Sequence, residues 1–158
     1  MKILAIDPGC TESAFALITM PDFSIIEKDK LPNETLKDML PRLSAEADTV
    51  AIEMVASYGM PVGREVFETC VWIGRFMAAS ERSAAFVYRM DEKMALCHDT
   101  RAGDANIRRA LVDRYARHDL ANGKGTKKNP DTFYGVSKDV WQAIAVGVTH
   151  YEKIKDKE

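Results

Sequence analysis

Two carboxylates follow directly on short apolar segments, where charged side chains are uncommon. Asp7 ends the run KILAID before the Pro8-Gly9 turn, and Glu53 follows the apolar residues 49–52 in the same way. Taken alone, Asp7 suits a cap of this turn equally well. Two carboxylates at neighbouring strand ends would repel each other, and a divalent cation between them removes that repulsion. Because hard cations such as Mg²⁺ prefer oxygen ligands, the pair predicts a metal-ion site.

A third carboxylate begins a long apolar helix near the carboxyl end of the chain. Residues 135–151, GVSKDVWQAIAVGVTHY, are apolar around most of the helix circumference, which predicts a buried helix. Asp139 lies in its first turn, where a negative side chain also suits the helix dipole, and Ser137 is the expected cap. Gln142 follows one turn later on the same face. Asp139 and Gln142 can therefore point at one site.

The apolar patterning predicts a mixed α/β sheet with helices on its faces. The first two strands are expected to form an antiparallel hairpin, which places Asp7 near the middle of the sheet. A length of 158 residues with 46% hydrophobic content fits one domain spanning the whole chain. Strands are predicted at 1–7, 13–19, 23–28, 49–53 and 85–89, and helices at 34–44, 64–80, 91–97, 104–117 and 137–153.

Some polar and apolar positions receive structural interpretations. Asp104 is expected to cap the helix that follows it, and His150 to be a polar residue at the end of the last helix. In helix 64–80 Trp72 and Phe76 are expected to project away from a stripe that faces the core. The residues of that stripe are Val66, Phe67, Cys70, Ile73, Gly74 and Met77.

Asp7 in DPG, Glu53 in AIEMV and the helix DVWQAIAVGVTHY together resemble the RuvC family of Holliday junction resolvases. The segments AIEMVASYGMPVGREVFETC and GDANIRRALVDRY are most similar to its phage-type branch. The resemblance implies an RNase H-like (RuvC-type) nuclease domain over residues 1–158, with a mixed sheet and helices on both faces. It also implies a homodimer that hydrolyses phosphodiesters of branched DNA, chiefly four-way junctions, with Mg²⁺ or Mn²⁺ as cofactor.

The resemblance also assigns the metal ligands. Asp7 is expected to bridge two ions about 3.5 to 4 Å apart, with Glu53 and Asp139 each completing one of them. The fourth ligand position of the family falls on Gln142, a departure that removes one negative charge. A glutamine carbonyl oxygen can still bind a cation. The departure affects the second ion more than the first.

The predicted DNA-binding residues lie in a chain without overall positive charge. The formal net charge is −2, but residues 1–60 carry five basic and ten acidic side chains, whereas residues 101–128 carry eight basic and three acidic ones. Loop 123–130 is expected to be flexible and to become ordered on DNA. By the resemblance an aromatic residue just after the glutamate stacks on a base at the crossover, and the aligned position here is about Ala56. Tyr58 is the nearest aromatic and is the expected wedge, with packing on its own loop as the alternative. The expected phosphate contacts are Arg64, Arg101, Arg108, Arg109, Lys124, Lys127 and Lys128.

Composition and motifs narrow the possible cysteine chemistry, cellular location and class of protein. Three cysteines without CxxC spacing indicate reduced thiols rather than a disulfide framework or a zinc site. With no long apolar run, we expect a soluble cytoplasmic protein of phage or bacterial cells, without a membrane partner. An actin-like ATP-binding module shares the Asp-x-Gly start but needs a longer chain. A related RNase H-like nuclease acting on RNA, and a junction-binding protein without catalysis, remain open.

Overall fold

The computed structural model describes residues 1–158 and is built around a five-stranded mixed sheet. The strands are β1 (Lys2–Asp7), β2 (Glu12–Thr19), β3 (Ser24–Pro32), β4 (Thr49–Met54) and β5 (Ala84–Tyr88), in the order β3-β2-β1-β4-β5. Strand β1 pairs antiparallel with β2 and parallel with β4, and β4 pairs parallel with β5. The predicted hairpin and the central position of Asp7 are confirmed. Asp7 and Glu53 therefore lie at the carboxyl ends of adjacent parallel strands.

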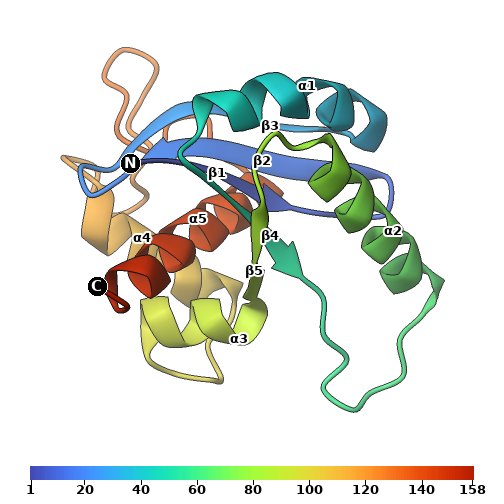
Figure 1. The fold of residues 1–158 in the computed structure, drawn as a ribbon. Coiled ribbons are helices and arrows are strands. Elements are labelled where there is room, and N and C mark those ends of the chain that lie inside the picture. Colours follow the sequence, from blue (N-terminus) through green and yellow to red (C-terminus); the bar gives the residue numbers. More distant parts are fainter.

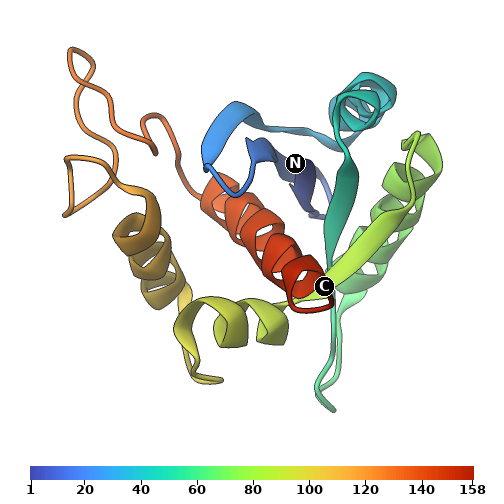
Figure 2. The same cartoon turned by 60° about the vertical axis from the view of Figure 1, so that its left-hand side comes forward.

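Helices cover both faces of this sheet (Figures 1 and 2). Helices α1 (Asn33–Glu46) and α2 (Arg64–Ala79) lie on one face and α5 (Asp139–Lys155) crosses the other. Beyond α5 lie α3 (Arg89–Glu92), a π-helical turn η1 (Lys93–Cys97) and α4 (Asp104–Tyr115). Each face has its own apolar core. No helix is long and apolar enough to cross a membrane.

Close packing of α5 on the central strands sets the position of its polar side chains. The predicted burial of this helix is confirmed, because the side chains along residues 143–149 are fully shielded from solvent. Gly147 lies where a Cβ atom would be 2.8 Å from Cδ1 of Ile18 and 3.1 Å from Cβ of Ala5. Glycine thus permits a close approach of the helix to β1 and β2. This approach holds Asp139 and Gln142 near the strand ends.

The predicted core-facing stripe of α2 is wrong for most of its members. Of the stripe only Ile73 is buried, whereas Phe67 is 61% and Met77 38% exposed. Phe76, expected to project away from the core, is instead fully buried. Apolar residues occur on two faces of this helix, and periodicity alone does not tell which face the sheet and α1 will cover. The other apolar face of α2 lies in solvent in the single chain.

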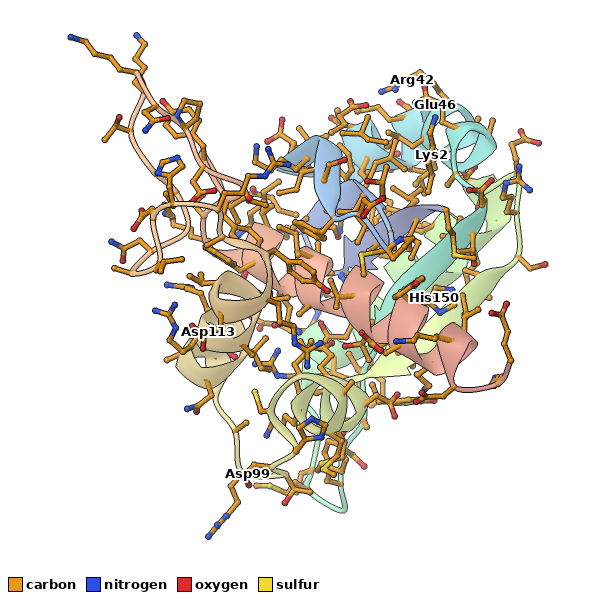
Figure 3. The ribbon with its side chains drawn as sticks, turned by 90° about the vertical axis from the view of Figure 1, so that its left-hand side faces the viewer. Lys2, Arg42, Glu46, Asp99, Asp113 and His150 are labelled. Carbon is orange, nitrogen blue, oxygen red and sulfur yellow. The ribbon has the colours of Figure 1, made fainter.

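Three smaller expectations also need correction. Ser137 does not cap α5, because the helix begins at Asp139 after Lys138 in a left-handed conformation, with no side-chain cap. Asp104 is the first residue of α4 rather than its cap, a position taken by Gly103. His150 is only 7% exposed, and its Nε2 lies 2.9 Å from Oγ1 of Thr49 on β4 (Figure 3). The three cysteines are free, as expected.

Candidate active site

Asp7 and Glu53 form a partly buried carboxyl pair at the ends of β1 and β4. Burial raises the pKa of Asp7 to about 9, and the negative charge of Glu53 adds to this effect. Burial likewise raises the pKa of Glu53, although a hydrogen bond with Asp7 and the charge of Arg89 oppose the rise. Without a cation the pair therefore retains a proton at neutral pH. Local sequence predicted both positions because each carboxylate directly follows an apolar strand.

Asp139, at the start of α5, lies near the carboxyl ends of β1 and β4. Its Oδ2 accepts an ion pair from Nζ of Lys30 at 2.6 Å, and its charge contributes to the raised pKa of Asp7. The sheet register explains the presence of Lys30, since Asp7 pairs with Ala14 on β2 and Ala14 pairs with Lys30 on β3. Residues in one such row point to the same face of a sheet. The sequence did not predict Lys30 at the site, because the pairing of these residues across three strands depends on the order of the strands in the sheet.

Gln142 is held in a network with two residues that the sequence did not single out, Arg89 and Glu92. Nε2 of Gln142 donates to Oε1 of Glu53 at 3.4 Å and to Oε2 of Glu92, while its Oε1 accepts from Nη1 of Arg89. Arg89 also donates to Oε2 of Glu92 at 3.0 Å and forms an ion pair with Asp104. Gln142 thus directs its oxygen at a guanidinium and its amide protons at carboxylates.

Glu92 is the most buried acid of the site. Its side chain is fully shielded from solvent, and its Oε1 has no hydrogen-bond partner. Burial raises the pKa of Glu92 to about 8, the charge of Glu53 adds to this, and Arg89 opposes it. The only sequence signal for Glu92 is its spacing, because it lies one helical turn before the buried Leu96. A charged residue in a core-facing phase is the pattern that could have revealed it.

Part of this cluster borders a pocket of about 330 Å³ beside α4 and α5. Three of the predicted metal ligands line it together with basic side chains. The lining residues are Glu53, Arg89, Asp104, Ile107, Arg108, Lys138, Asp139, Trp141 and Gln142. The pocket therefore combines acidic and basic groups, as a site for a metal-bound phosphate would require.

The donor set fits a hard cation only in part. Asp7 and Glu53 supply adjacent, partly buried oxygens, and the unpartnered Oε1 of Glu92 adds a buried acceptor nearby. However, no three acidic, histidine or cysteine side chains converge as they would around a bound ion. Asp139 points to Lys30 instead and would have to leave it to act as a ligand. The carboxylate oxygens are suitable ligands for a hard cation. In the structure their negative charge is instead balanced by a retained proton and by cationic side chains.

The predicted DNA-binding residues fall into two groups. Arg108 lies over the ring of Trp141, 5.3 Å from its centroid, and lines the pocket from α4. Arg109 instead donates to the backbone oxygens of Leu120 and Ala121, so its guanidinium fastens the loop after α4. Figure 3 shows its ion-pair partner Asp113 on the outer side of α4.

The remaining candidates lie in loops or on helix surfaces away from the pocket. Arg64 and Arg101 are about 90% exposed and pair with Glu68 and Asp99 respectively. Tyr58 lies in the loop between β4 and α2 with a φ of 49° and is 62% exposed, and no aromatic partner contacts it. The structure thus does not bring these three side chains together with the carboxylates.

The basic loop predicted to be flexible is folded as a hairpin in the free chain. Backbone hydrogen bonds join Thr126 and Asn129 in both directions, and the N–H of Asp131 donates to the carbonyl of Lys124. These bonds place Gly125 opposite Pro130 in an antiparallel bridge. The base of the hairpin is held by Asp131, whose carboxylate accepts from the backbone N–H groups of residues 117, 118, 119 and 132. These bonds hold the pKa of Asp131 well below its usual range. Figures 1 and 2 show this hairpin projecting beyond the body of the molecule.

Solved structures of Holliday junction resolvases share the fold. RuvC of Thermus thermophilus in complex with a Holliday junction substrate aligns with a TM-score of 0.73 at 12% identity, over 98% of this chain and 96% of that chain. A second Thermus thermophilus RuvC structure gives a TM-score of 0.69 at 14% identity, over 98% and 97%. Fowlpox virus resolvase, solved with substrate Holliday junction DNA, gives 0.50 at 16% identity, over 96% and 99%.

The comparisons confirm the predicted fold class. The chain has an RNase H-like fold, a mixed sheet with helices on both faces. More narrowly, the arrangement over nearly its whole length is that of RuvC. No protein-family model and no curated protein sequence matches the chain.

Proposed function

We propose that this protein is a metal-dependent endonuclease that cuts branched DNA, chiefly four-way junctions. The observation that carries the proposal is the placement of Asp7 and Glu53 at the ends of adjacent central strands of a RuvC-like sheet, with Asp139 facing them from α5. The RuvC and fowlpox virus proteins of the comparison were solved with Holliday junctions. Shared fold and an acidic strand-end site together favour the same class of reaction here.

The side chains have distinct roles in this reaction. Asp7, Glu53 and Asp139 would hold Mg²⁺, or Mn²⁺ in its place, and the Asp7–Glu53 pair would have to lose its retained proton to do so. When bound, the cation supplies a nucleophilic water and stabilises the leaving oxygen of the phosphodiester. Release of Asp139 frees Lys30 to pair with phosphate. The second ion expected from the resemblance would lie beside Gln142, where Arg89 is found.

Basic residues around the pocket provide the DNA surface. Arg108 lines both the acidic pocket and a neighbouring pocket of about 440 Å³ that also contains Lys124. Lys127 and Lys128 extend this surface along the exposed hairpin. Such residues bind phosphates without reading base sequence, which suits recognition of DNA by its shape. Tyr58, on the exposed loop after Glu53, is proposed to stack on a base at the crossover.

The exposed face of α2 is proposed to form a homodimer contact. Phe67, Val71, Gly74 and Met77 follow one another at helical spacing and are all exposed in the single chain. A continuous apolar strip of this kind usually marks an interaction surface. A two-fold contact between identical strips would relate two active sites by symmetry, as paired incisions across a junction require.

The test is cleavage of a labelled mobile four-way junction compared with a matched linear duplex, in Mg²⁺ or EDTA. We expect junction-selective nicks that require Mg²⁺ and that disappear in Asp7→Asn, while the variant still binds the junction. The control is Asp38→Asn, because Asp38 is an exposed acid of α1 that makes no ion pair. Cleavage by Asp7→Asn at the normal rate would refute the proposal. Binding without cleavage in Mg²⁺ or Mn²⁺ would instead indicate a junction-binding protein, and cleavage confined to an RNA substrate would indicate an RNA nuclease.

A further inference from the structure

Arg89 lies beside Gln142, the residue to which the resemblance assigns the fourth metal-ligand position. It is the first residue of α3, directly after the edge strand β5, and its side chain is 25% exposed. Its guanidinium contacts Gln142, Glu92 and Asp104 and lines the acidic pocket. A cation with three oxygen partners at the wall of a carboxylate pocket supplies positive charge without any bound ion.

The orientation of Gln142 follows from this arrangement. Its amide oxygen accepts from Arg89, and its NH₂ group faces Glu53 and Glu92, both of which only accept hydrogen bonds when ionised. Reversing the amide would point its oxygen at carboxylates and its protons at a guanidinium. Gln142 therefore presents its oxygen to Arg89, and the positive charge of this guanidinium disfavours a metal ion at the same oxygen.

Arg89 places a positive charge beside the carboxylates of the site. It forms ion pairs with Glu92 and Asp104, and its charge opposes the rise in the pKa of Glu53. A divalent cation beside Gln142 would have to share these oxygens with the positively charged guanidinium.

We propose that Arg89, held by Glu92 and Gln142, replaces the second divalent cation, so that each chain binds one metal ion at Asp7, Glu53 and Asp139. This inference rests on the proposed metal-dependent nuclease. In this arrangement Glu92 is a positioning residue for Arg89. The replacement of the second ion by Arg89 also explains how the site tolerates glutamine at position 142.

The experiment counts the Mn²⁺ ions bound by the complete protein, by the electron paramagnetic resonance signal of free Mn²⁺ during titration. The wild type is expected to bind one ion per chain. Arg89→Ala is expected to bind two, because the oxygens of Gln142 and Glu92 become available, whereas Arg89→Lys retains the charge and binds one. Arg42→Ala is the matched control, because Arg42 is half exposed, pairs with Glu27 and Glu46, and does not line the pocket. Circular dichroism melting checks that each variant is folded.

The outcomes separate this inference from the proposed function. Two ions per wild-type chain, with junction cleavage intact, would overturn the role of Arg89 and leave the nuclease proposal standing. This count needs no variant, so it decides the matter even if Arg89→Ala does not fold. One ion in both the wild type and folded Arg89→Ala would also overturn it. No bound Mn²⁺ together with no cleavage would overturn the nuclease proposal itself.

Discussion

Replacing Asp7 by Asn should remove a pH dependence of stability that the partly buried carboxyl pair creates. The pKa of Asp7 is raised from 3.8 to about 9 in the folded protein, chiefly by burial. Between these values the folded state keeps a proton that the unfolded chain has lost, so stability without metal falls as pH rises. Asparagine has nearly the same shape and carries no titratable proton. The free energy of unfolding of the variant should therefore lack this part of the decrease with pH.

The size of the effect follows from the number of protons involved. One retained proton changes the free energy of unfolding by about 1.4 kcal/mol per pH unit. Between pH 5 and pH 7 the wild type should therefore lose about 3 kcal/mol more than Asp7→Asn. For a chain of 158 residues this corresponds to about 6 to 12 °C in Tm. Glu53 and Glu92 also titrate, in the wild type and in Asp7→Asn alike. Both proteins therefore share a smaller decrease of the free energy of unfolding with pH.

The assay is urea unfolding at pH 5, 6, 7 and 8 in EDTA, repeated with Mg²⁺. In the wild type Mg²⁺ should restore stability increasingly as pH rises, because the cation replaces the retained proton. Asp7→Asn should show little restoration, and Asp38→Asn should follow the wild type. Equal pH slopes for the wild type and Asp7→Asn would refute the assignment of a partly buried, protonated carboxyl pair.

Three further predictions concern other parts of the molecule. Val71→Glu should place a charge in the proposed α2 contact and convert a dimer to a monomer by analytical ultracentrifugation; a dimer of unchanged stability would exclude this face. Replacing Lys127 and Lys128 by Ala should weaken junction binding and reduce the slope of log affinity against log salt by about 1.8; an unchanged slope would exclude phosphate contacts there. Asp131→Ala should speed amide hydrogen exchange across loop 117–132 but not in β1, and unchanged exchange would contradict its anchoring role. Because bonding depresses the pKa of Asp131, its stabilisation should be lost as pH falls below about 4, the usual Asp range.

Sequence alone predicted the elements because the signals are local. Apolar runs ended by turns marked the strands, and the positions of Asp7 and Glu53 followed from those runs. The apolar pattern of residues 135–151 predicted the helix that carries Asp139 and Gln142 equally well. Their meeting at one sheet edge required only that β1 and β4 be adjacent and parallel, which the structure confirms.

The missed site residues depend on relations between distant segments. Lys30 enters through the register of three strands, and Arg89 and Glu92 enter because α3 follows the edge strand and turns back toward α5. No local pattern encodes these contacts. The wrong stripe on α2 has a similar cause, because both of its faces are apolar and only the position of the sheet decides which face is buried.

Diffraction from crystals grown with junction DNA and Mn²⁺, recorded for anomalous scattering, would locate the metal ions that the proposed reaction requires. We predict one Mn²⁺ per chain, bound by Asp7, Glu53 and Asp139, with the Arg89 guanidinium still paired with Glu92. A crystal in which Mn²⁺ binds elsewhere, or in which these three carboxylates bind no ion beside the DNA, would contradict the account.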